Sequence, residues 1–122
     1  MKVSLTALIC LTAASAVAAA PQFRVGEEPL GLRWVDSVSG VLITQGCDQR
    51  SPCKALEAYV ESQKRVEKPG AYPREAGVNP GSLACRQRFK AEVFLATGRP
   101  GETQGFCRFA DKSIISLNGL NP

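Results

Sequence analysis

Residues 79–113 read NPGSLACRQRFKAEVFLATGRPGETQGFCRFADKS, and this stretch decides which fold the chain can adopt. It opens with Asn79-Pro80, a pairing that starts helices because Asn accepts hydrogen bonds from the first free backbone N–H groups and Pro tolerates the first turn. Ser82 is the alternative start signal. The residues from 82 to 88 suffice for about two helical turns. A short helix is therefore expected at the start of this stretch.

An antiparallel hairpin is expected immediately afterwards. Apolar residues recur at every second position over 91–95, Gly and Pro interrupt the chain at 98–101, and a second apolar run occupies 105–109. This order is typical of two strands joined by a loop. The apolar run at 114–117 then predicts either a third strand or the start of a short helix.

The N-terminus has the composition of a secretory signal peptide. Lys2 gives a positive start, residues 3–14 form an apolar stretch, and small side chains fill 15–20. This order is typical of a cleavable signal, with the cut best placed after Ala18. We therefore expect a signal peptide over 1–18, a secreted or periplasmic product, and no transmembrane segment after signal removal. An uncleaved anchor is the alternative, but the apolar stretch barely reaches the length of a membrane span.

Export changes how the remaining cysteines are interpreted, because thiols outside the reducing cytosol are expected to pair. The mature chain contains Cys47, Cys53, Cys85 and Cys107, which allow three connectivities. The sequence separations favour local closure, Cys47 with Cys53 and Cys85 with Cys107. A four-Cys zinc site is disfavoured because such sites use tight C-x2-C pairs, so neither a metal nor a cofactor is expected.

The first part of the mature chain predicts an arm followed by a hairpin. Residues 19–29 carry two Pro and a Gly without apolar periodicity, which indicates a loosely held, flexible arm. Order is expected to begin with the alternating apolar residues of 30–34, followed by turn residues at 36–40 and a β-branched run at 41–44. Trp34 is either a ligand-stacking platform or, more simply, part of the core.

A helix is expected after Ser51-Pro52, which offers an N-cap and a Pro at the first helical position. It should end by Lys68, because Pro69-Gly70 follows. Its apolar side chains lie near one face. They are Cys53, Leu56, Tyr59, Val60 and Val66.

Residues 69–78 are rich in Pro and Gly, the composition of a linker. We expect a boundary there between a hairpin-plus-helix segment over 30–68 and a module over 79–122. The fold class expected is α+β, with a small disulfide-stapled helix-plus-antiparallel-hairpin module preceded by the hairpin and helix segment.

The patterns N-P-G-x-x-x-C over 79–85 and G-F-C-R-F-A-D-K-S over 105–113 resemble a haemolysin-labelled family of small exported bacterial proteins, a domain of unknown function. The resemblance covers residues 79–120 only. It implies a helix-entry turn, a cysteine pair, and a hairpin or cap turn, all of them framework features. The positions concerned are Asn79, Pro80, Cys85, Cys107, Asp111 and Ser113.

The chain departs from this family pattern in three places. Phe89-Lys90 stand where the family has Gly-Gly, Lys112 replaces a turn Gly, and residues 117–120 lack the usual aromatic side chain. The family label implies membrane lysis, but the sequence supplies neither a long amphipathic helix nor an alternating pore hairpin.

The excess positive charge of the mature chain lies in its C-terminal part. Residues 19–80 hold eight basic and eight acidic side chains, whereas residues 81–122 hold six basic and three acidic ones. The six basic residues are candidates for contact with an anionic envelope polymer or an extracytoplasmic protein, and a solvated mixed surface is the alternative. Nucleic acid is not expected, because the chain lacks an aromatic-basic RNA motif. The six residues are Arg86, Arg88, Lys90, Arg99, Arg108 and Lys112.

No catalytic constellation is expected. The chain contains no His, which excludes Ser/His/Asp triads and Cys/His dyads. Glu92 and Glu102 flank the predicted hairpin, but a chain with eleven acidic residues contains such pairs by chance. The sequence therefore predicts a non-catalytic binding or envelope-associated module. The alternatives are an inhibitor of a secreted hydrolase that projects loop 97–104, and a cytolytic toxin, as the family label implies.

Overall fold

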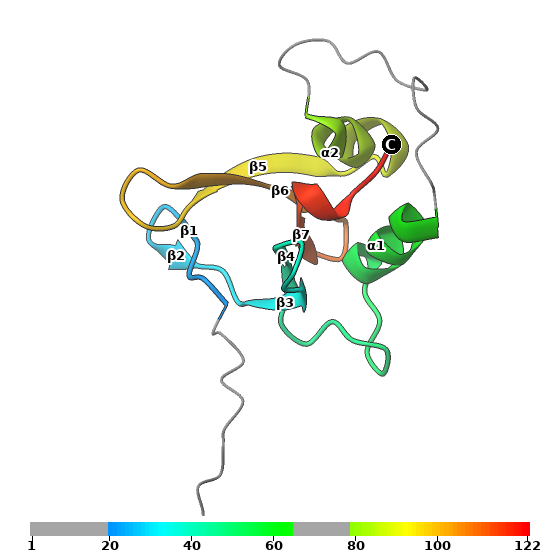
Figure 1. The fold of residues 1–122 in the computed structure, drawn as a ribbon, viewed down its shortest axis with the longest axis horizontal. Helices are drawn as coiled ribbons and strands as arrows, with labels where there is room; N and C mark the ends of the chain where they lie inside the picture. Colours follow the sequence, from blue (N-terminus) through cyan, green and yellow to red (C-terminus); the bar gives the residue numbers. More distant parts are fainter. Residues whose placement is uncertain (1–19, 65–78) are drawn as a thin grey trace, which may run out of the picture.

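The computed structural model describes residues 20–64 and 79–122 (Figure 1). The predicted signal peptide over 1–18 and the predicted linker over 69–78 lie outside the described residues. Seven antiparallel strands form one sheet, in the order β2-β1-β5-β6-β7-β4-β3. The strands are β1 (Arg24–Val25), β2 (Glu28–Pro29), β3 (Leu32–Asp36), β4 (Val41–Thr44), β5 (Glu92–Thr97), β6 (Thr103–Arg108) and β7 (Ile114–Ser116).

Helical segments lie beside this sheet (Figure 1). The prediction of an α+β protein is confirmed at this level, with most of the structure in the sheet. The helical segments are α1 (Lys54–Lys64), α2 (Pro80–Leu83), the π-helical turn η1 (Ala84–Arg88) and the 3-10 turn η2 (Leu117–Gly119).

The sheet curls back on itself, because its two edge strands are consecutive in the chain. Strands β2 and β3 stand at opposite ends of the strand order but are joined by Leu30-Gly31 alone. The Leu30 N–H donates to the Phe23 carbonyl at 2.8 Å, which extends the β1–β2 pairing. The Gln45 N–H donates to the Gly31 carbonyl at 2.9 Å, which extends the β3–β4 pairing. One bent segment therefore bridges the two edges.

An apolar cluster lies on the inner side of the curl. Phe106 is fully buried at its centre, with the Phe23 ring edge-on at 5.3 Å and the Phe94 ring stacked at 5.7 Å between centroids. Such aromatic pairs add to the free energy gained by apolar burial. The buried members come from six different strands or their immediate neighbours, so the cluster ties the whole sheet together. They are Phe23, Leu32, Leu42, Ala96, Phe106 and Ile114.

A second apolar cluster lies between the sheet and the helical segments. Ile43 and Ile115, from β4 and β7, are fully buried against Ala55 and Ala58 of α1. Cys85 of η1 and Cys107 of β6 belong to the same cluster. Because strand residues alternate between faces, the sheet has one cluster on each side.

The predicted disulfide connectivity is confirmed. Cys47 is bonded to Cys53 with a Cα–Cα distance of 5.6 Å, and Cys85 is bonded to Cys107 with a Cα–Cα distance of 5.8 Å. The first bridge fixes the start of α1 beside the end of β4, and the second fixes η1 to β6. Removal of a native bridge from a small domain typically costs about 2–5 kcal/mol of stability.

The predicted division into two modules is wrong. Strand β4 pairs with β7 at Ile43 and Ile115, and β1 pairs with β5 at Arg24 and Thr97. Strands from the first half of the chain thus stand on both sides of the β5–β6–β7 group. Neither half has a complete core of its own, because both apolar clusters contain residues from each half.

The predicted flexible arm over 19–29 is also wrong for the described residues 20–29. Phe23 is 1% exposed, and the short strands β1 and β2 pair with each other. The β1–β2 hairpin cannot be predicted from an apolar alternation, because each of its strands has only two residues. A single buried aromatic side chain anchors the segment instead.

The predicted apolar face of α1 needs correction. Its buried residues are Ala55, Ala58 and Ser62, whereas Val60 is 44% exposed. Small side chains let the helix approach β4 and β7 closely, and Leu56 and Tyr59 pack at the margin of the contact. Val66, the last member of the predicted face, lies outside the described residues.

The predictions for the C-terminal half are confirmed in outline. Asn79 caps α2 by accepting from the Gly81 N–H at 2.8 Å, and β5 and β6 form a regular hairpin from Glu92–Arg108 to Thr97–Thr103. Residues 114–117, for which two alternatives were open, form strand β7 and enter the turn η2.

Among the described residues, two non-glycine residues have a positive φ. They are Lys90 at 52° and Lys112 at 70°. These are positions where the haemolysin-labelled pattern has glycine. A left-handed backbone costs a residue with a Cβ roughly 1–2 kcal/mol, and glycine avoids this cost.

Lys112→Gly is therefore expected to stabilise the protein. The relief of backbone strain exceeds the extra chain entropy of glycine in the unfolded state, so the free energy of unfolding should rise by roughly 0.5–1 kcal/mol in urea titrations. Ala110→Gly is the matched control, because Ala110 is exposed in the same turn without a positive φ and should lose stability. Equal destabilisation by both changes would contradict a left-handed Lys112.

Candidate functional site

Residues Ala20, Pro21 and Gln22 form a shared wall between two hollows. The first hollow has a volume of about 680 Å³ and lies between this segment and residues 29–34. The second has a volume of about 690 Å³ and lies between this segment and the tip of the β5–β6 hairpin. Both are large enough for a small ligand or for part of a polymer chain.

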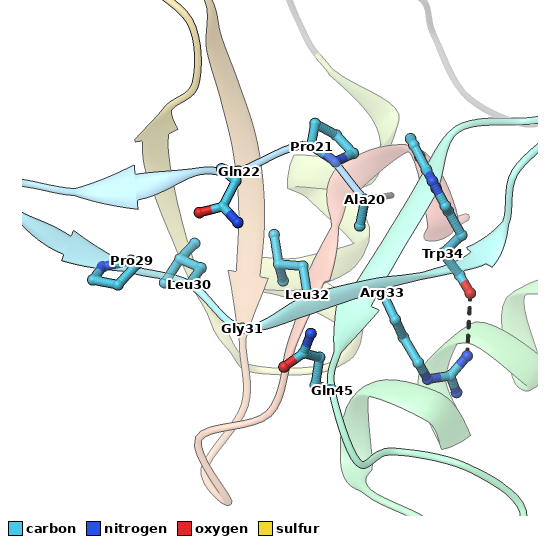
Figure 2. A pocket seen from close by; sticks show the side chains of 10 residues that line it. All are labelled: Ala20, Pro21, Gln22, Pro29, Leu30, Gly31, Leu32, Arg33, Trp34 and Gln45. Carbon is cyan, nitrogen blue, oxygen red and sulfur yellow. Dashed lines mark hydrogen bonds between the residues drawn. The ribbon is translucent and has the colours of Figure 1, made fainter. Parts of the chain in front are cut away.

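The first hollow is bordered by side chains of β3 that alternate in direction. Figure 2 shows Leu32 and Trp34 on the side that faces Ala20–Gln22, and Arg33 on the opposite side with Gln45. Trp34 is partly buried and packs against the inner apolar cluster, so it belongs to the core and to the rim of the hollow together. The position of Trp34 is therefore compatible both with a role in the core and with a role as a ligand-stacking platform.

The Arg33 guanidinium donates hydrogen bonds to backbone carbonyls of the protein. Its Nε donates to the Cys47 carbonyl at 3.0 Å, and a second nitrogen of the same guanidinium donates to that carbonyl as well. Its Nη1 donates to the Trp34 carbonyl at 3.2 Å, as drawn in Figure 2. Arg33 is the one charged residue among those that line the first hollow. The first hollow therefore offers apolar surface, amides and backbone groups.

The second hollow has three charged side chains among the ten residues that line it. Arg24 of β1, together with Arg99 and Glu102 of the hairpin tip, borders it. The tip is closed by hydrogen bonds from the Gly98 N–H to the Glu102 carbonyl at 3.0 Å and from the Glu102 N–H to the Arg99 carbonyl at 2.8 Å. The predicted projecting loop 97–104 is thus a short turn between paired strands.

The six basic residues predicted to contact an anionic partner do not share one location. Arg99 lies at the hairpin tip, whereas Arg108 pairs with Glu92 at the other end of the same hairpin. At 3.3 Å per residue these two ends are roughly 17 Å apart. Arg86 and Lys90 are exposed near the start of β5, and Lys112 is exposed in the β6–β7 turn.

Two of these basic residues, Arg88 and Arg108, interact with other side chains of the protein. Arg88 forms an ion pair with Glu61 of α1 at 2.5 Å, and its side chain is 14% exposed. The Arg108 guanidinium lies 4.4 Å from the centroid of the Phe94 ring, a cation–π contact. Arg88 therefore links η1 to α1, and Arg108 covers the edge of the inner cluster.

The same hairpin geometry separates Glu92 from Glu102, the two acidic residues that flank the predicted hairpin. Glu92 lies at the base of the hairpin and Glu102 lies at its tip. A separation of roughly 17 Å along paired strands exceeds the 5–10 Å over which two carboxylates cooperate in glycoside hydrolysis. These two side chains cannot act together on one bond.

Asp111 and Ser113 cap helix α1 from the β6–β7 turn. Asp111 Oδ2 accepts from the Lys54 N–H at 2.8 Å, and the Ser113 hydroxyl accepts from the Ala55 N–H at 3.0 Å. Asp111 Oδ1 also accepts from the Ser113 N–H at 2.9 Å. The first free N–H groups of the helix are thus satisfied by residues far away in the sequence. Asn79 and Pro80 perform the local equivalent at α2.

Within the described part of the chain, three groups have shifted pKa values, and none of the three lines either hollow. Partial burial opposes ionisation of Asp111, but hydrogen bonds from the Lys54 N–H and from Ser113 prevail and lower its pKa. Hydrogen bonds from Ser39, in the turn after β3, lower the pKa of Asp36. Burial, and then the nearby Asp36 charge, raise the pKa of Tyr59. These shifts belong to capping and packing.

The described part of the chain contains neither a membrane-spanning helix nor a cluster of metal-ligating side chains. No helix within residues 20–64 and 79–122 is long and apolar enough to cross a membrane. Across the same residues, no group of three or more His, Cys, Asp or Glu side chains is placed to hold a metal ion.

The chain matches no protein-family model, no curated protein and no solved structure. The resemblance to the haemolysin-labelled family therefore stays a prediction.

Sequence reasoning missed the N-terminal contribution to these hollows. Gln22 and Arg24 fall within the segment expected to be a loose arm. The signal that could have located them is Phe23, a large apolar residue alone among polar and Pro residues in a small protein that needs every core side chain. Residues adjacent to such an anchor are held at the surface in a fixed place.

Asp111→Ala should destabilise the protein in a pH-dependent manner. Loss of the cap should lower the free energy of unfolding by roughly 1–2 kcal/mol at pH 7. The pKa of Asp111 in the folded state lies below its ordinary value of 3.8, so the ionised carboxylate stabilises the fold above that pH. The stabilisation is lost as the pH falls through the lowered pKa.

Urea titrations at pH 7, 4 and 3 measure this dependence. The difference between wild type and Asp111→Ala should shrink as the pH falls, whereas exposed Glu27→Ala should show little difference throughout. A wild-type advantage that grows towards pH 3 would refute the capping role of the ionised carboxylate.

Proposed function

We propose that the protein is an exported, non-catalytic binding module whose partner is an anionic polymer of the cell envelope. The observation that carries this proposal is the pair of hollows, about 680 and 690 Å³, on either side of residues 20–22. The interior of the curled sheet is filled by apolar side chains, so the rim is where a ligand can be held.

The chemistry of the rim favours binding over catalysis. The first hollow presents Trp34 and Gln22, and the second presents two arginines with one carboxylate. None of the acids with a shifted pKa borders them. The two arginines that line the second hollow, Arg24 and Arg99, support an anionic partner.

Two observations support export and the family resemblance. Both disulfides are formed between the predicted partners, which suits an oxidising compartment. The left-handed φ of Lys90 and Lys112 matches positions where the family pattern has glycine. An inhibitor that uses the hairpin tip and a cytolytic toxin remain the competing proposals.

Polymer binding by the exported, disulfide-intact protein tests the proposal. Trp34 fluorescence should report saturable binding of polygalacturonate or polyphosphate and no binding of neutral dextran. Affinity should fall about tenfold between 50 and 200 mM NaCl if two or so charge contacts are made. Equal binding of dextran, or no polyanion binding at low salt, would refute the proposal.

The same protein preparation separates the competing proposals. Dye release from phosphatidylglycerol vesicles would place the protein among toxins, and loss of lysozyme or trypsin turnover at stoichiometric protein would place it among inhibitors. Polymer binding with intact vesicles and unchanged hydrolase rates is the result expected here.

A further inference from the structure

Two arginines from distant parts of the chain reach the second hollow. Arg24 stands opposite Thr97 in the β1–β5 pairing, and Arg99 follows Thr97 by two residues. Both side chains line the hollow of about 690 Å³ and both residues are exposed. The fold therefore brings two guanidinium groups to the same concave surface, although 74 residues lie between Arg24 and Arg99 in the chain.

Neither guanidinium is engaged within the described structure. Over residues 20–64 and 79–122, the one ion pair within 4.0 Å joins Arg88 to Glu61. Arg33 and Arg108 are also occupied, by backbone carbonyls and by an aromatic ring. Arg24 and Arg99 make no such contact with the described residues, so their charges are available to a ligand.

The backbone that carries these arginines is held in place. Phe23, adjacent to Arg24, is buried, and its ring lies 3.1 Å from the position that a Cβ on Gly98 would occupy. Gly98, adjacent to Arg99, is also hydrogen-bonded to Glu102 across the turn. Phe23 thus packs against the hairpin tip and fixes the separation of the two arginine-bearing segments. Preorganisation of this kind lowers the entropy lost on binding.

Glu102 places a negative charge in the second hollow, and this charge disfavours anion binding there. It lines the same surface, yet its carboxylate lies more than 4.0 Å from the guanidinium nitrogens of both arginines. The three side chains together carry a formal charge of +1. A ligand anion would be attracted by the two arginines and repelled by this carboxylate.

From this geometry we propose that Arg24 and Arg99 form a clamp for one anionic group, a carboxylate or a phosphate, carried by a polymer, and that Glu102 limits its affinity. Guanidinium groups suit such anions because their N–H donors match the oxygen spacing. The inference rests on the proposed function and names the site at which the polymer is recognised. A polymer fits better than a lipid surface, because the clamp lines a concave surface and residues 98–102 contain no aromatic or aliphatic side chain beyond Pro100.

The test compares variants that change charge inside and outside the hollow. Arg24→Gln and Arg99→Gln should each weaken polygalacturonate or polyphosphate binding about fivefold and lower the salt dependence by about one unit of log–log slope. Arg50→Gln is the matched control, an exposed arginine outside both hollows. Glu102→Gln should strengthen binding about threefold, whereas exposed Glu57→Gln on α1 should not.

The outcomes separate this inference from the proposed function. If the wild-type protein binds neither polymer, the proposed function fails. If it binds but Arg24→Gln and Arg99→Gln behave like Arg50→Gln, or Glu102→Gln behaves like Glu57→Gln, the clamp is overturned while polymer binding stands. Comparison of the two polymers assigns the anion as carboxylate or phosphate. Arginine-dependent binding to phosphatidylglycerol vesicles without polymer binding would overturn the choice of a polymer.

Discussion

The pairing of β4 with β7 is the constraint on which the rest of the structure depends. A single registered pair, Ile43 with Ile115, joins these strands, and hydroxyl groups complete the contact on both sides. The Thr44 hydroxyl accepts from the Ile114 N–H at 2.7 Å, and the Ser116 hydroxyl accepts from a β4 N–H at 2.9 Å. Because these polar groups are buried or partly buried, leaving them unpaired would cost about 1–3 kcal/mol each. The two halves of the chain are thus joined by a short strand contact in which the hydroxyl groups must lie opposite their N–H donors.

The curl of the sheet creates the surface on which the proposed function depends. Once β4 meets β7, the chain before β3 can cross to the far edge and pair with β5, and the Phe23 ring enters the inner cluster. Residues 20–22 are then held between the bent β2–β3 segment and the hairpin tip, with a hollow on each side. The pairing of β1 with β5 brings Arg24 and Arg99 to the second hollow. The site therefore exists only in the curled sheet that both halves of the chain form, and a separate C-terminal module could not form it.

Sequence reasoning predicts the local features of this protein well and the long-range ones poorly. The Cys47–Cys53 and Cys85–Cys107 bridges, the hairpins and the helix after Pro52 follow from short-range spacing, turn residues and caps. The flexible arm, for the described residues 20–29, and the division into two modules are not what the structure shows. Pro and Gly content describes local chain stiffness and says nothing of which strands pair. Of the clamp, Arg99 was among the predicted contacts, but Arg24 was missed because β1 is too short to have a pattern.

The most direct test of this account asks whether the two halves unfold as one unit. Phe106 belongs to the C-terminal half and Trp34, the only tryptophan, belongs to the N-terminal half. Phe106→Leu should cost roughly 1–2 kcal/mol and leave the protein folded. Urea unfolding followed by Trp34 fluorescence and by far-UV circular dichroism should then shift to the same lower midpoint. A Trp34 transition that stays at the wild-type midpoint while the dichroism transition moves would contradict a single shared sheet.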